Sequence, residues 1–273
     1  LEKRGDLAKE IQGLIKTKRI EENVRQEDDL NQKVKEITAQ IDALTEGPRP
    51  PQMTLSDVAK KIRELQEERK KIRKDLEENA PQRYLDISEV LSIPDDDRIK
   101  MKITTPKKSV IEDIVGKSQA IIEKMTSKTL GLSKDDLVAR AKKAGQRSQY
   151  SLCSRRIEIS SDSKLPIVIH EMAHWLEDSS DHVHKRCVEF LDYRCKRESP
   201  EKLSKLTGEK GYGAKEVARK DKFFHPYCGK DYVEKDGDRY ATEILSMGFE
   251  RILEKPLQFM QEDPEYYSFV LLL

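Results

Sequence analysis

Apolar residues in the first eighty positions recur at alternating spacings of three and four, and most positions between them are Lys, Arg, Glu or Gln. This pattern is typical of helices that pack as a coiled coil. The segment EGPRPPQ, residues 46–52, interrupts the pattern, and its prolines cannot lie inside a helix. We therefore expect a helical hairpin over residues 1–80, with arms of about 38 and about 25 residues. The apolar positions are Leu7, Ile11, Leu14, Leu30, Val34, Ile37, Ile41 and Leu44, then Leu55, Val58, Ile62, Leu65, Ile72 and Leu76.

Residues 81–148 mix short patterns of both periods. The stretches 84–93 and 99–105 are typical of strands, whereas 109–127 and 133–145 are expected to form amphipathic helices. Ser133 could cap the second of these helices. No motif in this segment carries chemistry, so we expect a linker and scaffold for the domain that follows, residues 149–273.

That last domain begins with a predicted strand near 153–160, then a polar turn and a helix from Pro166 to Ser179. Proline suits the first turn of a helix, because the amide hydrogen it lacks would have no partner there. The expected fold class is α+β: a mainly helical domain with a small sheet, preceded by the long helical hairpin.

Charge and composition limit the classes of binding partner that we expect. Charged residues make up 38% of the chain, yet the formal net charge is +1, so no field of one sign favours a nucleic acid. No apolar run is long enough to cross a membrane. The four cysteines form no C-x-x-C pair, which favours free thiols and a cytoplasmic location.

The predicted helix contains the motif H-E-x-x-H, which places His170 and His174 one turn apart on one face. Two imidazoles at this spacing can bind one zinc ion, and Glu171 then lies beside the position that water occupies. Glu171 would accept a proton from that water while the metal polarises a peptide carbonyl. The alternative is a buried polar cluster that is satisfied without a metal.

A third ligand must come from elsewhere. The metzincin extension would place glycine at 177 and histidine at 180, but the chain has Glu177 and Ser180, which excludes that class. His182 and His184 follow on the same stretch. A straight helix puts His182 about two turns beyond His174, too far for one ion, so we expect both histidines at the surface.

The segment GDRYATEILSMGFERILEKP predicts a second buried helix with Glu243 in its first half. A gluzincin takes its third ligand as a glutamate from such a helix. We therefore predict Glu243 as the third ligand. Glu250 lies seven residues further on, nearly on the same face, and is the alternative.

Three segments together carry a resemblance to a known group: PIVIHEMAHWLE, DKFFHPYCGKDY and YATEILSMGFE. They resemble metallopeptidase-like domains of the gluzincin type encoded in prophages and tailed phages, some of them fused to head-morphogenesis proteins. The resemblance covers about residues 150–255 and implies His170, His174 and Glu243 as zinc ligands with Glu171 as the base. The hairpin is similar to the N-terminal helices of phage capsid precursors. A phage-associated or bacterial cytoplasmic location follows from the resemblance.

A peptidase also needs a donor for the oxyanion of the reaction. We select Tyr227 and His225, in the loop between the two predicted helices, as catalytic candidates. They could instead only pack the loop. A Cys228 ligand would define a different class of site. The loop's other tyrosines are Tyr212, Tyr232 and Tyr240.

The favoured function is a zinc-dependent endopeptidase that binds one Zn2+ per chain and acts on a protein or peptide. The alternative is an inactive or minor structural protein of a phage particle, which uses residues 1–80 for self-association or partner binding. A third class, a peptidase that cleaves repressors, shares the zinc chemistry, but we find no DNA-binding helix-turn-helix. Neither nucleic acid nor membrane is expected as a partner.

Overall fold

The computed structural model describes residues 18–106, 109–133, 136–196, 198–208, 211–230, 232–233 and 239–273. They fall into two compact units that meet in sequence between Ile87 and Ser88. The fold class is α+β and mainly helical, as the sequence predicts. Among these residues, none of the helices has the length and apolar character needed to span a bilayer.

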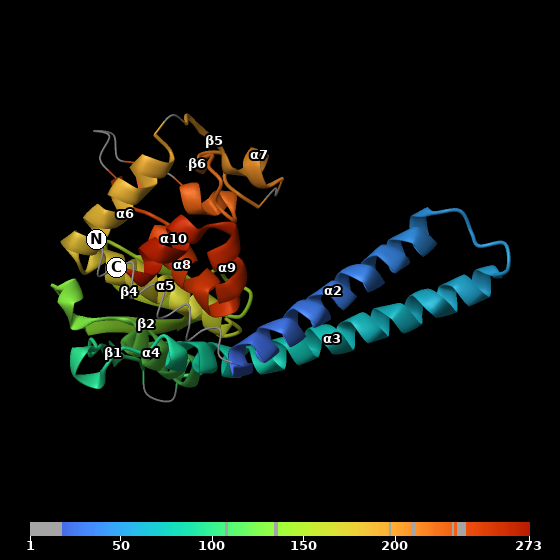
Figure 1. The fold of residues 1–273 in the computed structure, drawn as a ribbon, viewed down its shortest axis with the longest axis horizontal. Helices are drawn as coiled ribbons and strands as arrows, with labels where there is room; N and C mark the ends of the chain where they lie inside the picture. Colours follow the sequence, from blue (N-terminus) through green and yellow to red (C-terminus); the bar gives the residue numbers. More distant parts are fainter. Residues whose placement is uncertain are drawn as a thin grey trace. The chain divides into compact units, whose positions relative to one another are not determined.

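The first unit is the predicted hairpin. Helices α2 (Lys18–Glu46) and α3 (Leu55–Val90) run side by side in opposite directions (Figure 1). The first 17 positions of the predicted hairpin lie outside the described residues. Thr54 caps α3 in a reciprocal arrangement, because its hydroxyl accepts from the Asp57 amide while Asp57 accepts from the Thr54 amide.

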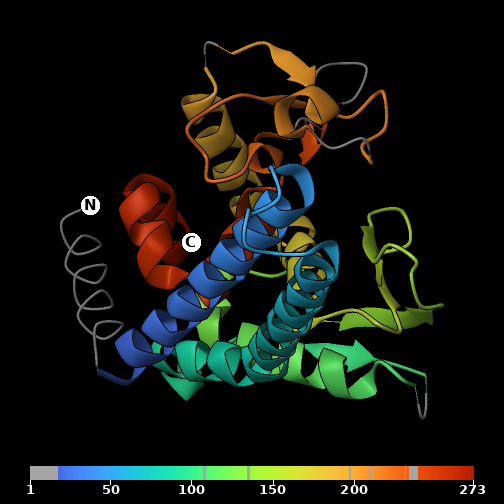
Figure 2. The same ribbon diagram turned by 90° about the vertical axis from the view of Figure 1, so that its right-hand side faces the viewer.

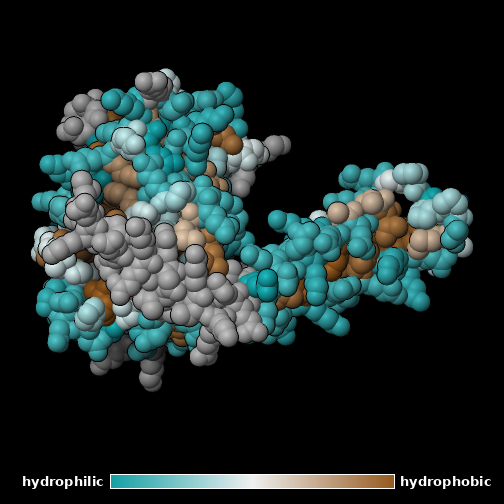
Figure 3. Space-filling view, in the orientation of Figure 1, coloured by the Kyte–Doolittle hydropathy of each residue, from teal (hydrophilic) through white to brown (hydrophobic). Residues whose placement is uncertain are grey.

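The heptad positions form the core of the hairpin. Figure 3 shows apolar side chains along the line between the two helices, bordered by hydrophilic ones. Arg69 occupies one seam position, where its guanidinium donates to the Thr38 hydroxyl at 3.2 Å. Polar pairing therefore replaces apolar contact at this one layer of the seam. The core residues are Ile37, Ile41 and Leu65, with Leu44, Ile62 and Ile72 packed against them.

The second unit is built around a four-stranded sheet of order β1-β2-β4-β3. Strands β1, β2 and β4 are parallel, and β3 is antiparallel to β4 at one edge. Two small antiparallel sheets, β5-β6 and β7-β8, complete the strands of the described residues. The strands are β1 (Lys102–Thr104), β2 (Asp136–Lys142), β3 (Gln149–Ser151), β4 (Arg156–Ser160), β5 (Pro200–Lys202), β6 (Val217–Arg219), β7 (Tyr232–Val233) and β8 (Arg239–Ala241).

Helix α5 lies at the centre of this unit and packs on α4, on α8 and on strands β3 and β4. Figure 2 shows β5, β6 and α7 at the opposite end of the unit from the four-stranded sheet. The helices and 3-10 turns are η1 (Asp95–Asp97), α4 (Glu112–Met125), η2 (Lys128–Leu130), α5 (Leu165–Asp178), α6 (Asp181–Arg194), α7 (Leu203–Thr207), η3 (Pro226–Gly229), α8 (Ile244–Glu254), α9 (Pro256–Glu262) and α10 (Pro264–Leu271).

Two predicted elements are wrong. The stretch 84–93 is not a strand, because α3 continues to Val90. Its buried residues Tyr84, Ile87, Ser88 and Leu91 follow a spacing of three and four, which is that of a helix.

The stretch 133–145 is not a helix, because it contains the strand β2. Leu137 and Ala139 are fully buried, whereas the residues that alternate with them, Asp136, Val138 and Arg140, are exposed. This alternation has the period of a strand, and β2 pairs with β1 on one side and with β4 on the other. Through these pairings, the segment 81–148 and the domain 149–273 share one sheet.

Candidate metal centre

Helix α5 brings His170 and His174 to one side of the site. The helix starts one residue before Pro166 and buries most of its apolar residues, so its position in the unit is fixed on several sides. Both imidazoles are 14% exposed, and their ring centroids are 4.9 Å apart. The spacing of one helical turn therefore presents both rings to the same point, as the motif predicts.

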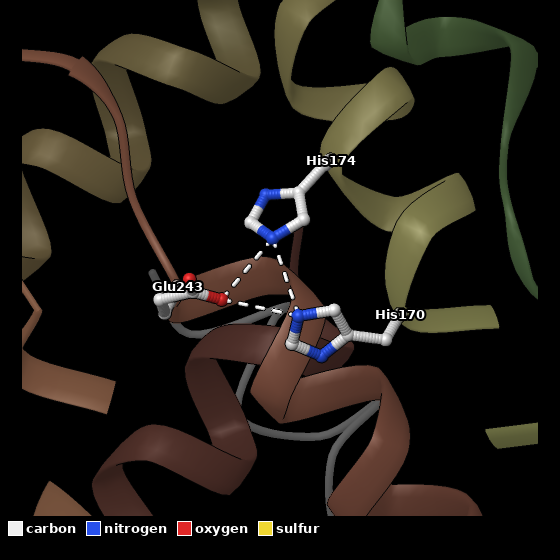
Figure 4. Close-up of side chains that lie close together, drawn as sticks. All are labelled: His170, His174 and Glu243. Atoms are coloured by element: carbon white, nitrogen blue, oxygen red, sulfur yellow. Dashed lines mark hydrogen bonds and ion pairs between the residues drawn. The ribbon is translucent and has the colours of Figure 1, made fainter. Parts of the chain in front are cut away.

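Glu243 completes a three-residue group from another element. It immediately precedes α8, which packs on α5, and its side chain is 1% exposed. Its Oε2 lies 3.2 Å from Nε2 of His170 and 3.1 Å from Nε2 of His174, and the two nitrogens are 3.2 Å apart (Figure 4). Among the described residues, these three are the group that could hold a metal ion.

The spacing of these three atoms suits a small cation. Ligands at about 2.0–2.1 Å from a tetrahedral ion lie about 3.3 Å from each other. The observed separations of 3.1–3.2 Å are close to that value. A nitrogen, nitrogen and oxygen donor set on three sides leaves the fourth side for water or substrate.

The charged groups of the cluster shift the pKa values of their neighbours. Burial lowers the pKa of His170, but its hydrogen bonds to Glu243 and Glu250 outweigh burial and raise that pKa to about 10. Burial raises the pKa of Glu243, but the His174 and His170 imidazoles outweigh it and hold that pKa well below its usual range. A metal ion that enters this cluster therefore has to displace protons.

Glu171 is held beside the histidines by the edge of the sheet. The residue is 8% exposed, and its Oε2 accepts a hydrogen bond of 2.6 Å from the backbone amide of Tyr150 in β3. The Tyr150 hydroxyl donates to Asp178 at 2.7 Å, one further contact between β3 and α5. With one carboxylate oxygen held in place, Glu171 has a defined orientation within the cavity.

Two hollows meet at these residues. The first, of about 280 Å³, is lined by all three candidate ligands, and the second, of about 780 Å³, shares part of its lining with the first. Five residues line both: Arg147, Ser148, His170, Glu171 and Tyr227. Glu171 therefore contributes to the walls of both hollows.

Tyr227 and His225 have different surroundings. Tyr227 lines both hollows, and its hydroxyl oxygen accepts from Arg147 Nη2 at 2.9 Å and from Lys230 Nζ at 3.1 Å. His225 lines the second hollow, and its Nδ1 accepts from the Tyr227 amide at the start of η3. Neither residue belongs to the three-atom cluster, and their catalytic roles stay predictions.

Tyr232 contacts the cluster more directly. Its hydroxyl donates to Oε1 of Glu243 at 2.5 Å, and Ser246 donates to Oε2 at 2.9 Å. Burial and the Glu243 carboxylate raise the pKa of Tyr232, so its hydroxyl keeps the proton that it donates. The remaining loop tyrosines, Tyr212 and Tyr240, line one hollow each.

The structure also places the other candidate residues near the site, and His184 differs from its predicted position. Glu250, the alternative ligand, faces the outer nitrogen of His170, with Oε2 3.1 Å from Nδ1. His182 is exposed as expected, but His184 is partly buried with both ring nitrogens hydrogen-bonded. Cys228 is fully buried and lies outside the cluster, and burial raises the pKa of its thiol.

Neither Arg147 nor Lys230 was predicted as a site residue, although Lys230 lies inside the segment DKFFHPYCGKDY. A lysine next to a glycine in an aromatic-rich loop could have suggested a buried amine. Gly229 permits this loop to approach β6, because a Cβ at this position would lie 2.1 Å from the carbonyl oxygen of Arg219.

The four cysteines are free, as expected.

Comparison of the chain with models of protein families, with curated proteins and with solved structures finds no match. The class of this protein has to be judged from its own geometry. That geometry defines a buried centre of two histidines and one glutamate that could hold a metal ion, with a second glutamate beside it.

Proposed function

We propose that the protein is a zinc-dependent peptidase. The observation that carries the proposal is the mutual spacing of 3.1–3.2 Å among Nε2 of His170, Nε2 of His174 and Oε2 of Glu243. Two imidazoles and one carboxylate are a donor set that suits catalytic zinc with an open fourth position. The resemblance of the three sequence segments to phage-encoded gluzincins supports the same choice of metal.

When bound, zinc would polarise a substrate carbonyl and lower the pKa of a water molecule in the open position. Glu171 is the general base in this proposal. The Tyr150 amide holds one of its carboxylate oxygens and leaves the other to accept a proton from the water. The proton then passes from Glu171 to the amine that leaves when the peptide bond breaks.

Tyr227 is the proposed oxyanion donor. Its oxygen already accepts from Arg147 and Lys230, so its own proton is left for donation toward the site. Burial and the nearby Glu243 raise the pKa of this phenol, which keeps it protonated. Both cationic side chains also favour negative charge near the Tyr227 hydroxyl.

The two hollows support cleavage within a chain rather than at its end. They share Glu171 in their walls, so a polypeptide that occupied both hollows would extend beyond the reaction point. The substrate is therefore proposed to be an internal segment of a protein, in line with the resemblance to domains of phage.

An assembly protein that uses the hairpin is the second candidate. The hairpin favours it, because its described residues, 18–87, belong to a unit with its own apolar core. A purely structural metal site, however, has no use for Glu171 held in an open cavity. The two roles are also compatible, since the hairpin could bring the metal centre to its substrate.

Glu171→Gln tests the proposal. We expect the purified protein to hold about one zinc ion per chain, and the variant to keep that zinc. Peptidase activity on a peptide library should fall by about 10²–10⁴-fold, because only the proton acceptor is lost. Elemental analysis and mass spectrometry of the digested library give the two readouts.

Two results would contradict the proposal. A wild-type chain that retains no zinc after dialysis would remove the metal centre. Wild-type activity in the Glu171→Gln protein would show that the base is another residue. If zinc is bound but the wild type cleaves no peptide, the assembly function takes its place.

A further inference from the structure

A second polar cluster, formed by Glu177, His184 and Thr242, adjoins Glu243 because Thr242 immediately precedes it. Glu177 on α5 is 3% exposed, and both of its carboxylate oxygens are engaged. The Thr242 hydroxyl donates to Oε2 at 2.9 Å, and Nδ1 of His184 lies 3.0 Å from Oε1. None of these three residues has a part in the proposed reaction.

His184 connects three segments of the chain. It lies on α6, and while Nδ1 faces Glu177, its Nε2 is 3.1 Å from the backbone carbonyl of Arg239 in β8. A carbonyl has no proton to donate, so Nε2 donates to it. The hydrogen bond to Glu177 raises the pKa of His184 and outweighs the opposing effect of burial. The imidazole therefore holds α5, α6 and β8 together.

Thr242 transmits this arrangement to the metal centre. Its side chain is fully buried, and its hydroxyl accepts from the amide of Ile244 at 3.2 Å while it donates to Glu177. One hydroxyl thus fixes the residue before Glu243 and the residue after it. The backbone of Glu243 is held from both sides relative to α5.

These contacts hold Glu243, the candidate ligand that α5 itself does not carry. His170 and His174 lie on one helix, so the helix itself sets their separation. Glu243 comes from a different segment, and only tertiary contacts can place its carboxylate against the two imidazoles. We propose that Glu177 and His184 are positioning residues, which set the geometry of the third metal ligand through Thr242.

The inference rests on the proposed metal centre, and zinc affinity tests it. Purified full-length protein and its variants compete with a chromophoric chelator for Zn2+ at pH 7. Thr242→Val removes the hydroxyl at nearly constant volume, and Thr242→Ser keeps it. His184→Ala removes both imidazole contacts, and His182→Ala is the matched control, since His182 is an exposed residue of the same helix.

We expect Thr242→Val and His184→Ala to weaken zinc binding by about 10-fold or more, as changes of outer partners of metal ligands do. Thr242→Ser and His182→Ala should stay within about twofold of the wild type, because each keeps the contacts to Glu177. Circular dichroism confirms that each variant is folded before its affinity is compared.

The outcomes are distinguishable. A wild-type chain without zinc affinity contradicts the proposed function itself. Normal zinc affinity in folded Thr242→Val and His184→Ala, even with a lower melting temperature, overturns the positioning role and leaves a cluster that only stabilises the fold. If Thr242→Val does not fold, the comparison of His184→Ala with His182→Ala decides the question.

Discussion

Glu250 contacts the ring nitrogen of His170 that does not face Glu243. It lies on α8, seven residues after Glu243, but its Oε2 is 3.1 Å from Nδ1 of His170, not from Nε2. A carboxylate at Nδ1 keeps a ring proton on that nitrogen, so Nε2 is the nitrogen that could ligate a metal. Glu250 therefore orients His170 so that its Nε2 faces Glu243.

Single substitutions of the two glutamates should separate these roles. Glu243→Ala removes a ligand and should abolish measurable zinc binding, whereas Glu250→Ala removes an orienting contact and should weaken binding by about 10-fold. Competition with a chromophoric chelator gives both affinities. Equal losses would mean that Glu250 also ligates the metal, and a larger loss from Glu250→Ala would reverse the assignment.

At the scale of elements, the position of α8 depends on a close approach to α10. A Cβ at Gly248 would lie 2.4 Å from Cγ2 of Val270 and 3.4 Å from Cε2 of Tyr266. Valine is branched at Cβ and has little rotamer freedom with which to move aside. The glycine therefore lets α8 lie against α10, and Glu243 immediately precedes α8.

Gly248→Ala should lower the free energy of unfolding by about 1–3 kcal/mol, because the added methyl group overfills a packed interface. Gly116→Ala in α4 is the matched control. That glycine is exposed, and nothing lies within 4 Å of the point that an alanine Cβ would occupy, so alanine should stabilise the helix by about 0.5–1 kcal/mol. Chemical denaturation measures both, and a stabilising Gly248→Ala would show that α10 yields easily.

At the scale of the molecule, the chain divides into a helical hairpin and a unit that contains the whole candidate metal centre. The hairpin has its own core, and residues Ser88–Leu273 have theirs. The three candidate ligands, Glu171 and both hollows all lie in the second unit. Metal binding should therefore not require the hairpin.

A fragment of residues 81–273 should bind zinc within about twofold of the full chain, since every candidate ligand and its partners remain. Isothermal titration of both proteins with Zn2+ measures the effect. Loss of binding in a fragment that does not fold would show that the hairpin is needed for the stability of the second unit. Loss of binding in a folded fragment would show that the hairpin shapes the site.

Local patterns in the sequence were enough for several features. The heptads and the proline segment predict the hairpin, because coiled-coil packing and helix termination depend on residues close in sequence. The pair His170 and His174 share a face for the same reason, since one helical turn separates them. Pro166 and the apolar residues after it likewise predict the buried helix α5.

Other features depended on contacts between distant segments. The stretch 133–145 became a strand because β1 and β4 offer it hydrogen-bonding partners on both sides, which no local pattern records. Arg147 and Lys230 meet at Tyr227 only because the chain folds back on itself.

The sequence therefore predicted the residue types of the centre, but not its geometry. Residue types and spacing predicted two histidine ligands, Glu171 as a base and Glu243 as the third ligand, with Glu250 as the alternative. Only the packing of α8 on α5 decided between them, placing Glu243 at Nε2 of both histidines and Glu250 at Nδ1 of one. Two glutamates seven residues apart lie on nearly the same helical face, so local spacing cannot distinguish them. Their distances to the two histidines are set by tertiary contacts between α8 and α5.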